Sequence, residues 1–185
     1  MKNSIRITGG DLKGRKVSFD FKNTLRPTSS KLREVLFNWL QFEIKGCECL
    51  DLFAGTGSLG IEAISRGASK LIFIESNKKN FLSLKECISE LDLKKQSKVF
   101  FKNGLSWLNE NDLSNFDLIF LDPPFNQNYE KKVLDILDKN KSLKSSCKIY
   151  IEFSKFDEIK LPDSFKIFKE KTIGDVKAFL LKNDN

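Results

Sequence analysis

Apolar and polar positions along the chain follow a pattern that predicts strands alternating with helices. Short apolar runs predict buried strands at Cys49–Phe53, Leu71–Glu75, Val99–Lys102, Asp117–Leu121 and Lys148–Phe153. Helical spacing after the first four runs predicts helices at Leu59–Arg66, Lys78–Leu91, Ser106–Asn109 and Tyr129–Lys139. This alternation favours an α/β fold with a mostly parallel sheet and helices on both faces.

The two ends of the chain depart from this alternation. Near the start, Ile5–Ile7 and Val17–Phe19 are β-like and flank a glycine-containing stretch, which predicts a small hairpin. A helix is predicted around Leu32–Leu40, because its apolar residues recur at helical spacing after a stop and cap at residues 27–29. Phe165–Lys169 and Val176–Leu181 predict a final antiparallel pair, which brings the expected sheet to seven strands.

Length and composition suit one soluble domain. The chain has 185 residues, of which 40% are hydrophobic and 31% charged. No apolar run approaches the roughly 20 residues of a membrane span, and the first residues lack the apolar core of a secretion signal. We therefore expect a cytoplasmic protein with one domain over residues 1–185, divided into an N-terminal extension (1–30) and an α/β core (31–185).

The positive charge is concentrated near the start of the chain. Residues 1–33 hold nine Lys or Arg and two Asp, which accounts for the whole net charge of +7. A basic arm on a neutral body indicates a polyanionic partner, most simply nucleic acid. The alternative is a solvated terminus with incidental charge. The arm residues expected to contact phosphates are Arg6, Lys13, Arg15 and Lys16.

Cysteine and histidine usage excludes several classes of site. The chain has no histidine, and its four cysteines form no C-x-x-C pair. Zinc fingers, Cys-His and Ser-His nucleophiles and a histidine general base are therefore excluded, and we expect no metal. We expect the cysteines to be buried in the core, where they act as small hydrophobic residues. Any chemistry must run on carboxylates, carbonyls and positioning.

A glycine-rich turn follows the first core strand and opens a helix. Gly55 and Gly57 let the backbone approach a ligand, and Glu75 at the end of the next strand can accept hydrogen bonds from ribose hydroxyls. The spacing with Gly60 also satisfies the dinucleotide fingerprint G-x-G-x-x-G. Asp51 favours S-adenosylmethionine over NAD, because a carboxylate there suits an ammonium group and would repel a pyrophosphate.

The sequence Asp122-Pro123-Pro124-Phe125 closes the strand ending at Leu121. It offers a carboxylate, a backbone carbonyl and an aromatic face within four residues, which together can hold a planar base by its exocyclic amino group. A simple turn is the alternative, because Asp and Pro are common turn formers. By the rule for open α/β sheets, the turns after Phe53, Glu75, Lys102 and Leu121 should line one crevice.

With these motifs the chain resembles class I S-adenosylmethionine-dependent methyltransferases of the [DN]-P-P-[FYW] amino-methylating type. Among them it is most similar to the bacterial 16S ribosomal RNA guanine-N2 methyltransferases. The resemblance runs over nearly the whole chain. The segments that carry it are Ile5–Gly10, Lys13–Lys16, Leu25–Thr28, Arg33-Glu34, Leu36–Leu40, Leu50–Gly55 and Asp122–Phe125.

The resemblance implies a Rossmann-like catalytic core and a set of site residues. Cofactor contacts are expected from Asp51, Phe53, Gly55, Gly57, Glu75, Ser76, Asn103, Gly104 and Asp122. Arg26 and Thr28 are expected over the mouth of the active site, as further RNA-binding residues. The chain departs from the family pattern at Ile151–Ser154, and it has Phe179 where the family often has Tyr.

The implied reaction is methylation of the N2 amine of a guanine, of the position-966 type, in 16S ribosomal RNA or the assembling small subunit. Asp122 and the Pro123 carbonyl would accept hydrogen bonds from the amine, and Phe125 would stack on the flipped base. Two alternatives stay open: DNA adenine-N6 methylation, and a catalytically idle RNA-binding or assembly protein. We expect a monomer, because one face must meet a bulky ribonucleoprotein.

Overall fold

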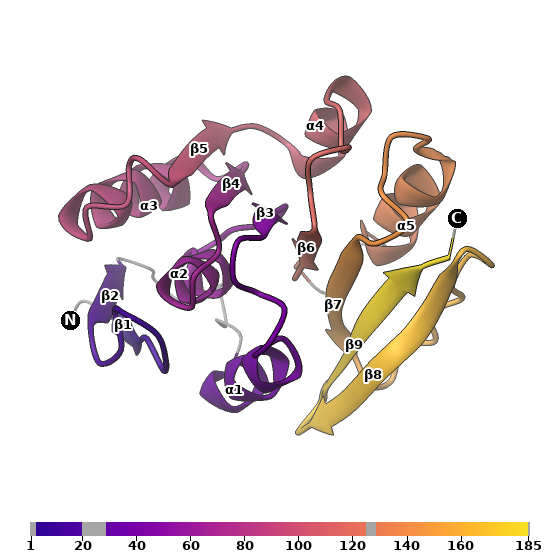
Figure 1. The fold of residues 1–185 in the computed structure, drawn as a ribbon, viewed down its shortest axis with the longest axis horizontal. Coiled ribbons are helices and arrows are strands. Elements are labelled where there is room, and N and C mark those ends of the chain that lie inside the picture. Colours follow the sequence, from indigo (N-terminus) through magenta and orange to yellow (C-terminus); the bar gives the residue numbers. More distant parts are fainter. Residues whose placement is uncertain (1–2, 20–28, 125–128, 185) are drawn as a thin grey trace.

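The computed structural model describes residues 3–19, 29–124 and 129–184, and Figure 1 shows their arrangement. A two-stranded hairpin, β1 (Asn3–Arg6) and β2 (Lys16–Phe19), precedes the core. The core strands are β3 (Glu48–Asp51), β4 (Lys70–Glu75), β5 (Ser97–Phe101), β6 (Leu118–Leu121), β7 (Lys148–Ser154), β8 (Phe165–Ile173) and β9 (Val176–Asn183). The helices are α1 (Ser30–Trp39), α2 (Ser58–Ser65), α3 (Lys78–Glu90), α4 (Gly104–Glu110) and α5 (Tyr129–Lys139).

The seven core strands form one sheet in the order β5-β4-β3-β6-β7-β9-β8. Strands β5 to β7 are parallel, and β9 lies antiparallel between β7 and β8. The chain runs outward from β3 to β5 on one side and then returns to place β6 on the other side of β3. The switch point of the sheet therefore lies between β3 and β6, where open α/β sheets bind ligands beyond the strand ends.

Apolar side chains cover both faces of the sheet. On one face, residues of α1, α2 and α3 such as Leu36, Ile61 and Leu84 pack in one buried cluster. On the other face, α4 and α5 contribute Trp107 and Leu134 to a second cluster. The arrangement confirms the predicted α/β class with an antiparallel C-terminal pair. None of the helices among the described residues is long and apolar enough to cross a membrane.

The hairpin is joined to helix α2 through a buried carboxylate. Glu62, which is fully buried, accepts hydrogen bonds from the Thr8 amide (2.8 Å), the Thr8 hydroxyl (2.7 Å) and the Gly9 amide (2.8 Å). It also forms ion pairs with Arg66 (2.9 Å) and with the buried Arg33 (3.4 Å) of α1. The Glu62 carboxylate is thus paired with two arginines where the hairpin, α1 and α2 meet, and these contacts hold the hairpin against the core.

A glycine allows this close contact. Gly10 has a φ of +75°, and a Cβ atom there would lie 1.7 Å from the Ser65 carbonyl oxygen. The Asp11 amide donates to the same carbonyl at 2.7 Å, and the Ser65 hydroxyl donates to the Gly9 carbonyl at 2.6 Å. The predicted hairpin is therefore present as an ordered, docked element.

The element boundaries differ from the sequence predictions mainly at the last two strands. Strand β8 reaches Ile173 and β9 reaches Asn183, so both are longer than the predicted Phe165–Lys169 and Val176–Leu181. Cross-strand pairing with β9 holds the polar second half of β8 in the sheet, although it lacks apolar alternation. At the start of α1, the Ser29 hydroxyl accepts a hydrogen bond from the Leu32 amide (3.1 Å), which confirms the predicted cap.

Candidate functional site

A cleft of about 200 Å³ lies at the carboxyl ends of β3, β4, β5 and β6. The turns that follow these four strands all contribute to its lining, through residues such as Gly55, Ser76, Asn103 and Asp122. The prediction that these four turns would line one crevice is confirmed. The cleft occupies the place where the strand order reverses, as expected for a ligand site in an open α/β sheet.

Glu75 joins two of these turns. One of its carboxylate oxygens accepts a hydrogen bond from the Gly55 amide (2.8 Å), and the other accepts one from the Asn77 amide (2.6 Å). Glu75 is buried and also lines the cleft. Each carboxylate oxygen has a second lone pair, so the same side chain can still accept a hydrogen bond from a ligand hydroxyl.

The two glycines of the β3–α2 turn have different surroundings. Gly55 (φ +52°) lines the cleft, where it leaves the backbone open to a ligand. Gly57 (φ +75°) does not line the cleft, and a Cβ atom there would lie 2.4 Å from the Leu84 side chain. A larger residue at position 57 would therefore disturb the packing of this turn against α3.

The far end of the cleft is formed by the turn after β5. The Asn103 side-chain oxygen accepts hydrogen bonds from the Leu105 amide (3.0 Å) and the Ser106 amide (3.2 Å), which caps helix α4. Because the side-chain oxygen of Asn103 already accepts these two hydrogen bonds, its side-chain NH₂ group is the part that can donate to a ligand. A donor suits a ring nitrogen of adenine better than it suits the exocyclic amino group, which needs an acceptor.

An aromatic pair forms one wall. Phe53, after β3, and Tyr129, at the start of α5, have ring centroids 5.5 Å apart at an interplanar angle of 57°. Both residues line the cleft, together with Pro124. These rings offer an apolar surface for a planar ligand. Tyr129 was not among the predicted site residues, because at the sequence level it is only the first residue of a helix.

Four carboxylates lie along the carboxyl edge of adjacent strands: those of Glu75 on β4, Asp51 on β3, Asp122 after β6 and Glu152 on β7. We call them the acidic row. Asp51 is in register with Phe73 and with Phe120, which lie two residues before Glu75 and Asp122. Leu121 pairs with Ile151, so Asp122 and Glu152 follow side by side. Because side chains alternate between faces along a strand, the four members lie on the same face of the sheet.

The acidic row raises the pKa of one of its own members. Burial, and next the negative charge of Asp122, raise the pKa of Asp51 to about 8, and Glu75 adds to the effect. A hydrogen bond from the Gly60 amide at 3.3 Å opposes the rise only in part. A carboxylate in this position gains from a cation placed beside it, whereas a pyrophosphate would add repulsion. The carboxylates of the acidic row thus fit a cationic ligand such as S-adenosylmethionine better than the pyrophosphate of NAD.

The far end of the acidic row is supported by a tyrosine. The Tyr150 hydroxyl donates a hydrogen bond of 2.7 Å to the Glu152 carboxylate, and both side chains are buried. Burial, and next the Glu152 charge, raise the pKa of Tyr150 well above its usual range. Tyr150 therefore remains a donor at neutral pH. Glu152 had been noted in the sequence only as part of a departure from the family pattern.

The structure brings most of the predicted cofactor residues together. Those that line the cleft are Phe53, Gly55, Glu75, Ser76, Asn103, Gly104 and Asp122. Asp51 lies buried in the acidic row beneath it. Arg6, Lys13, Arg15 and Lys16 are exposed on the hairpin and the loop within it. Pro123 is buried beside Asp122, whereas Phe125, Arg26 and Thr28 lie outside the described residues.

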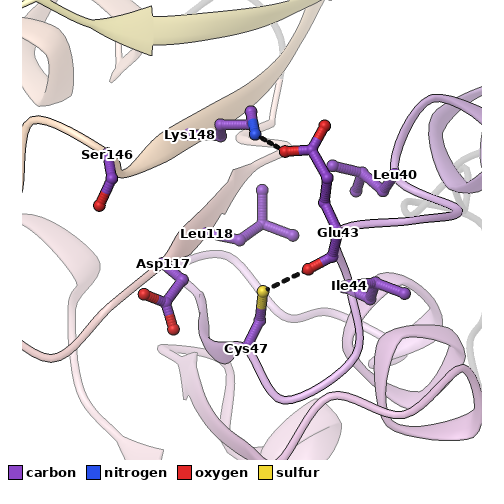
Figure 2. Close-up of a pocket in the computed structure, with 8 residues that line it drawn as sticks. All are labelled: Leu40, Glu43, Ile44, Cys47, Asp117, Leu118, Ser146 and Lys148. Atoms are coloured by element: carbon purple, nitrogen blue, oxygen red, sulfur yellow. Dashed lines mark hydrogen bonds and ion pairs between the residues drawn. The ribbon is translucent and has the colours of Figure 1, made fainter.

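A second cavity, of about 240 Å³, lies at the opposite, amino ends of β3, β6 and β7. Figure 2 shows the Lys148 ammonium directed at the Glu43 carboxylate, and the Cys47 thiol donating to the Glu43 carbonyl oxygen at 2.9 Å. Burial, and next the charge of Asp117, raise the pKa of Cys47. A thiol kept protonated is a poor nucleophile, so Cys47 is not suited to nucleophilic catalysis.

A family model and several curated proteins match almost the whole chain. The model described as Conserved hypothetical protein 95 matches residues 5–182. A protein of Buchnera aphidicola (subsp. Acyrthosiphon pisum) named ribosomal RNA small subunit methyltransferase D is 43% identical, over 97% of this chain and 94% of that protein. The protein of the same name from Escherichia coli K12 is 34% identical, over 93% of this chain and 86% of that protein.

Solved structures give the same picture. A putative methyltransferase from Escherichia coli has a TM-score of 0.87 and 33% identity, and the match covers 98% of this chain and 99% of that one. A Thermus thermophilus 16S rRNA N2 G1207 methyltransferase, solved in complex with AdoMet and guanosine, has a TM-score of 0.71 at 20% identity. That match covers 100% of this chain and 50% of the other, and it supports the class I methyltransferase fold alone.

Proposed function

This chain belongs to the family described as Conserved hypothetical protein 95, and its relatives include proteins named ribosomal RNA small subunit methyltransferase D. We propose that it transfers a methyl group from S-adenosylmethionine to 16S ribosomal RNA. The proposed target is the exocyclic N2 amine of a guanine, at a site of the position-966 type. The observation that carries the proposal is the acidic row, which meets the Asp122-Pro123-Pro124 turn at the cleft.

The acidic row and the cleft are suited to hold S-adenosylmethionine. Asp51 takes the α-ammonium group, Glu75 accepts from the ribose hydroxyls, and the turn at Asn103 and Gly104 meets the adenine. When bound, the cofactor supplies a methyl group on a positively charged sulfur. The negative charge of the row stabilises that positive charge, because opposite charges interact strongly where burial lowers the dielectric.

Asp122 and Pro123 position the acceptor. The guanine N2 lone pair is delocalised into the ring, and hydrogen bonds from its two N–H groups to the Asp122 carboxylate and the Pro123 carbonyl localise it. They also aim the nitrogen at the methyl group. Positioning of this kind is worth about 7–11 kcal/mol in favourable cases. The proton leaves the methylated amine easily, so Asp122 need not be a strong base.

The base must leave its stack to reach this turn. A base paired within a helix cannot bring its amino group into a cleft of about 200 Å³. Phe125, next to the double proline, is the proposed stacking partner of the flipped guanine. Phosphates are held by the exposed hairpin residues Arg6, Lys13, Arg15 and Lys16.

Transfer of tritiated methyl groups tests the proposal directly. Purified protein and S-adenosylmethionine are incubated with undermethylated small ribosomal subunits, naked 16S RNA and duplex DNA, and the products are digested for nucleoside analysis. We expect N2-methylguanosine from subunits or RNA and no label on DNA. Methyladenine from DNA, or another methylated nucleoside from RNA, would overturn the assignment.

A substitution tests the role of the turn. Asp122→Ala should reduce kcat for methyl transfer at saturating cofactor by at least about a hundredfold, because the contact that positions the amine is lost. Asn109→Ala is a matched control on an exposed face of α4. An Asp122→Ala enzyme that kept more than about a tenth of the wild-type rate would remove Asp122 from the mechanism.

A further inference from the structure

Three lysines lie directly opposite one another in the C-terminal part of the sheet. Lys148 of β7 is in register with Lys182 of β9, and Lys182 is in register with Lys166 of β8. Cross-strand partners lie on the same face, with Cβ atoms about 4.5–5.5 Å apart, and like charges in these positions destabilise a sheet. Such an arrangement is costly unless something outside the sheet neutralises it.

An irregularity in β8 extends the positive charge. Pairing with β9 shifts between Ile167 and Lys169, so that Phe168 is an extra residue and Lys169 opposes Leu180. Leu180 lies two residues before Lys182 and is therefore on the same face. Lys171 follows on that face, opposite Ala178. Together with the three in-register lysines, Lys169 and Lys171 form what we call the lysine row.

An exposed aromatic ring lies among these lysines. The Phe168 side chain is 38% exposed, and the ammonium groups of Lys182, Lys169 and Lys148 lie 3.9, 5.1 and 6.0 Å from its ring centroid. A ring face attracts cations, which gathers the three charges around one apolar platform. An exposed ring bordered by cations is the combination that proteins use to bind nucleic-acid strands.

The row has little internal neutralisation. Lys148 forms an ion pair with Glu43, visible in Figure 2, but no other member has a carboxylate partner within the described part of the chain. Burial, and next the charge of Lys182, lower the pKa of Lys148, although Glu43 is beside it. On the opposite face of the same strands, Lys177 is paired with Glu170 (3.8 Å). The surplus of positive charge therefore belongs to one face.

Protection of a sheet edge explains only part of this pattern. Exposed edge strands often carry lysines, which discourage pairing with another chain. However, Lys148 and Lys182 lie on β7 and β9, inside the sheet, where there is no edge to protect.

The lysine row leads toward the proposed active site. Lys171 is opposite Ala178, Ala178 is opposite Glu152, and Glu152 lies beside Asp122. Three strand spacings therefore separate Lys171 from Asp122, or about 14 Å. Figure 1 shows β8 and β9 at the end of the sheet beyond β7, on the side away from the hairpin. The lysine row and the hairpin therefore lie in different parts of the molecule.

We propose that the lysine row, with Phe168, binds the phosphate backbone of the RNA substrate and forms a second RNA contact besides the N-terminal hairpin. The inference rests on the proposed function for the identity of the nucleic acid. With this second contact besides the hairpin, the RNA is held at two places on the protein while the target base enters the cleft. Phosphates are kept out of the cleft itself by the negative charge of its floor.

Charge reversal tests the row. In one variant, the exposed Lys166, Lys169, Lys171 and Lys182 are replaced by glutamate, which keeps the edge strand charged. A control variant reverses the same number of exposed lysines at the other side of the protein: Lys85, Lys94, Lys95 and Lys98. Both variants have the same net charge. A third variant with glutamine at the four row positions avoids new acid–acid contacts in the fold.

Two quantities are measured for each variant: equilibrium binding to undermethylated small subunits over a range of salt, and KM and kcat for methyl transfer. We expect the row variants to raise Kd and KM at least about tenfold, with kcat within about twofold of wild type. The glutamine variant should also lower the salt slope by about 3, because each lost contact to a single strand accounts for about 0.7. Cofactor affinity and the control variant should stay at wild-type values.

The outcomes separate this inference from the proposed function. Wild-type Kd, KM and salt slope in the row variants would overturn it while methyl transfer to RNA stands. Equal weakening by the row and control variants would also overturn it, because net charge would then suffice. If wild-type protein binds subunits without methylating them, and the row variants lose binding, the row stands and the proposed reaction fails. A wild-type protein that binds no RNA would overturn both.

Discussion

Cofactor binding should depend on pH through Asp51. Its pKa is raised to about 8 by burial and by the neighbouring Asp122 and Glu75. At pH 7 only about one molecule in eleven then carries Asp51 as a carboxylate, the form that can pair with an ammonium group. Ionising the side chain at pH 7 costs about 1.4 kcal/mol, and at pH 6 about twice as much.

The affinity for S-adenosylmethionine should therefore rise about tenfold per pH unit between pH 6 and pH 7.5. Close to one proton should be released on binding over this range, because Asp51 enters the complex ionised. 5′-Methylthioadenosine, which lacks the amino-acid part of the cofactor, should bind with little pH dependence. Asp51→Asn should bind the cofactor more weakly at pH 7.5 and lose the pH slope, since its side chain does not titrate.

Isothermal titration calorimetry measures both quantities. Titrations at four pH values give the slope, and repetition in buffers of different ionisation enthalpy gives the number of protons released. A wild-type Kd that is constant from pH 6 to 7.5 would refute the reasoning. So would an Asp51→Asn variant with the wild-type slope, because another group would then be responsible.

The same pKa affects the stability of the unliganded protein. An aspartate in the unfolded chain has a pKa of about 3.9, so between that pH and about 8 the folded state binds more protons than the unfolded state. Asp51 therefore contributes stability below about pH 4 that is lost as the pH rises toward 8. Urea unfolding should show this loss in wild type and a flatter profile in Asp51→Asn. Identical profiles would contradict the linkage.

Three further predictions concern the supporting structure. Glu62→Ala should lower the free energy of unfolding by about 3–5 kcal/mol in urea titrations, because it leaves the Arg33 charge buried without its carboxylate; a loss below 1 kcal/mol would contradict this. Gly10→Ala should weaken RNA binding without changing cofactor affinity, because its Cβ would force the hairpin away from helix α2. An unchanged affinity for RNA would show that RNA binding does not depend on the docked position of the hairpin. Tyr150→Phe should cost about 1–3 kcal/mol in thermal unfolding by removing the donor to Glu152, and wild-type stability would show that this hydrogen bond contributes nothing net.

The sequence predicted the parallel core and the composition of the cleft well. Each core strand is a short apolar run bounded by turn residues, and the carboxyl ends of parallel strands must share one edge. That rule was enough to bring the turns near Gly55, Ser76, Asn103 and Asp122 together without knowledge of strand order. The strand order itself was not predicted, and it decides which side chains become neighbours within the sheet.

Several features depend on that missing information. Glu152 joins the acidic row only because β7 pairs with β6 in the observed register, which no local pattern specifies. The lysine row likewise requires β9 to lie between β7 and β8. Arg33 was counted with the basic arm as charge available to a polyanion, and this was wrong. Its guanidinium is 1% exposed and paired with Glu62, a residue 29 positions away.

Strand β7 links the two charged rows, and this explains how one sheet can serve ligands of opposite charge. Lys148 at its amino end and Glu152 at its carboxyl end lie four residues apart on the same face, or about 13 Å. The two ends of this strand therefore carry charges of opposite sign on one face of the sheet. On the proposed function, the acidic end attracts a cationic cofactor and repels phosphates, while the lysine end attracts the RNA backbone. A base can then reach Asp122 only by leaving its strand, so the charge pattern itself favours a flipped nucleotide over a paired one.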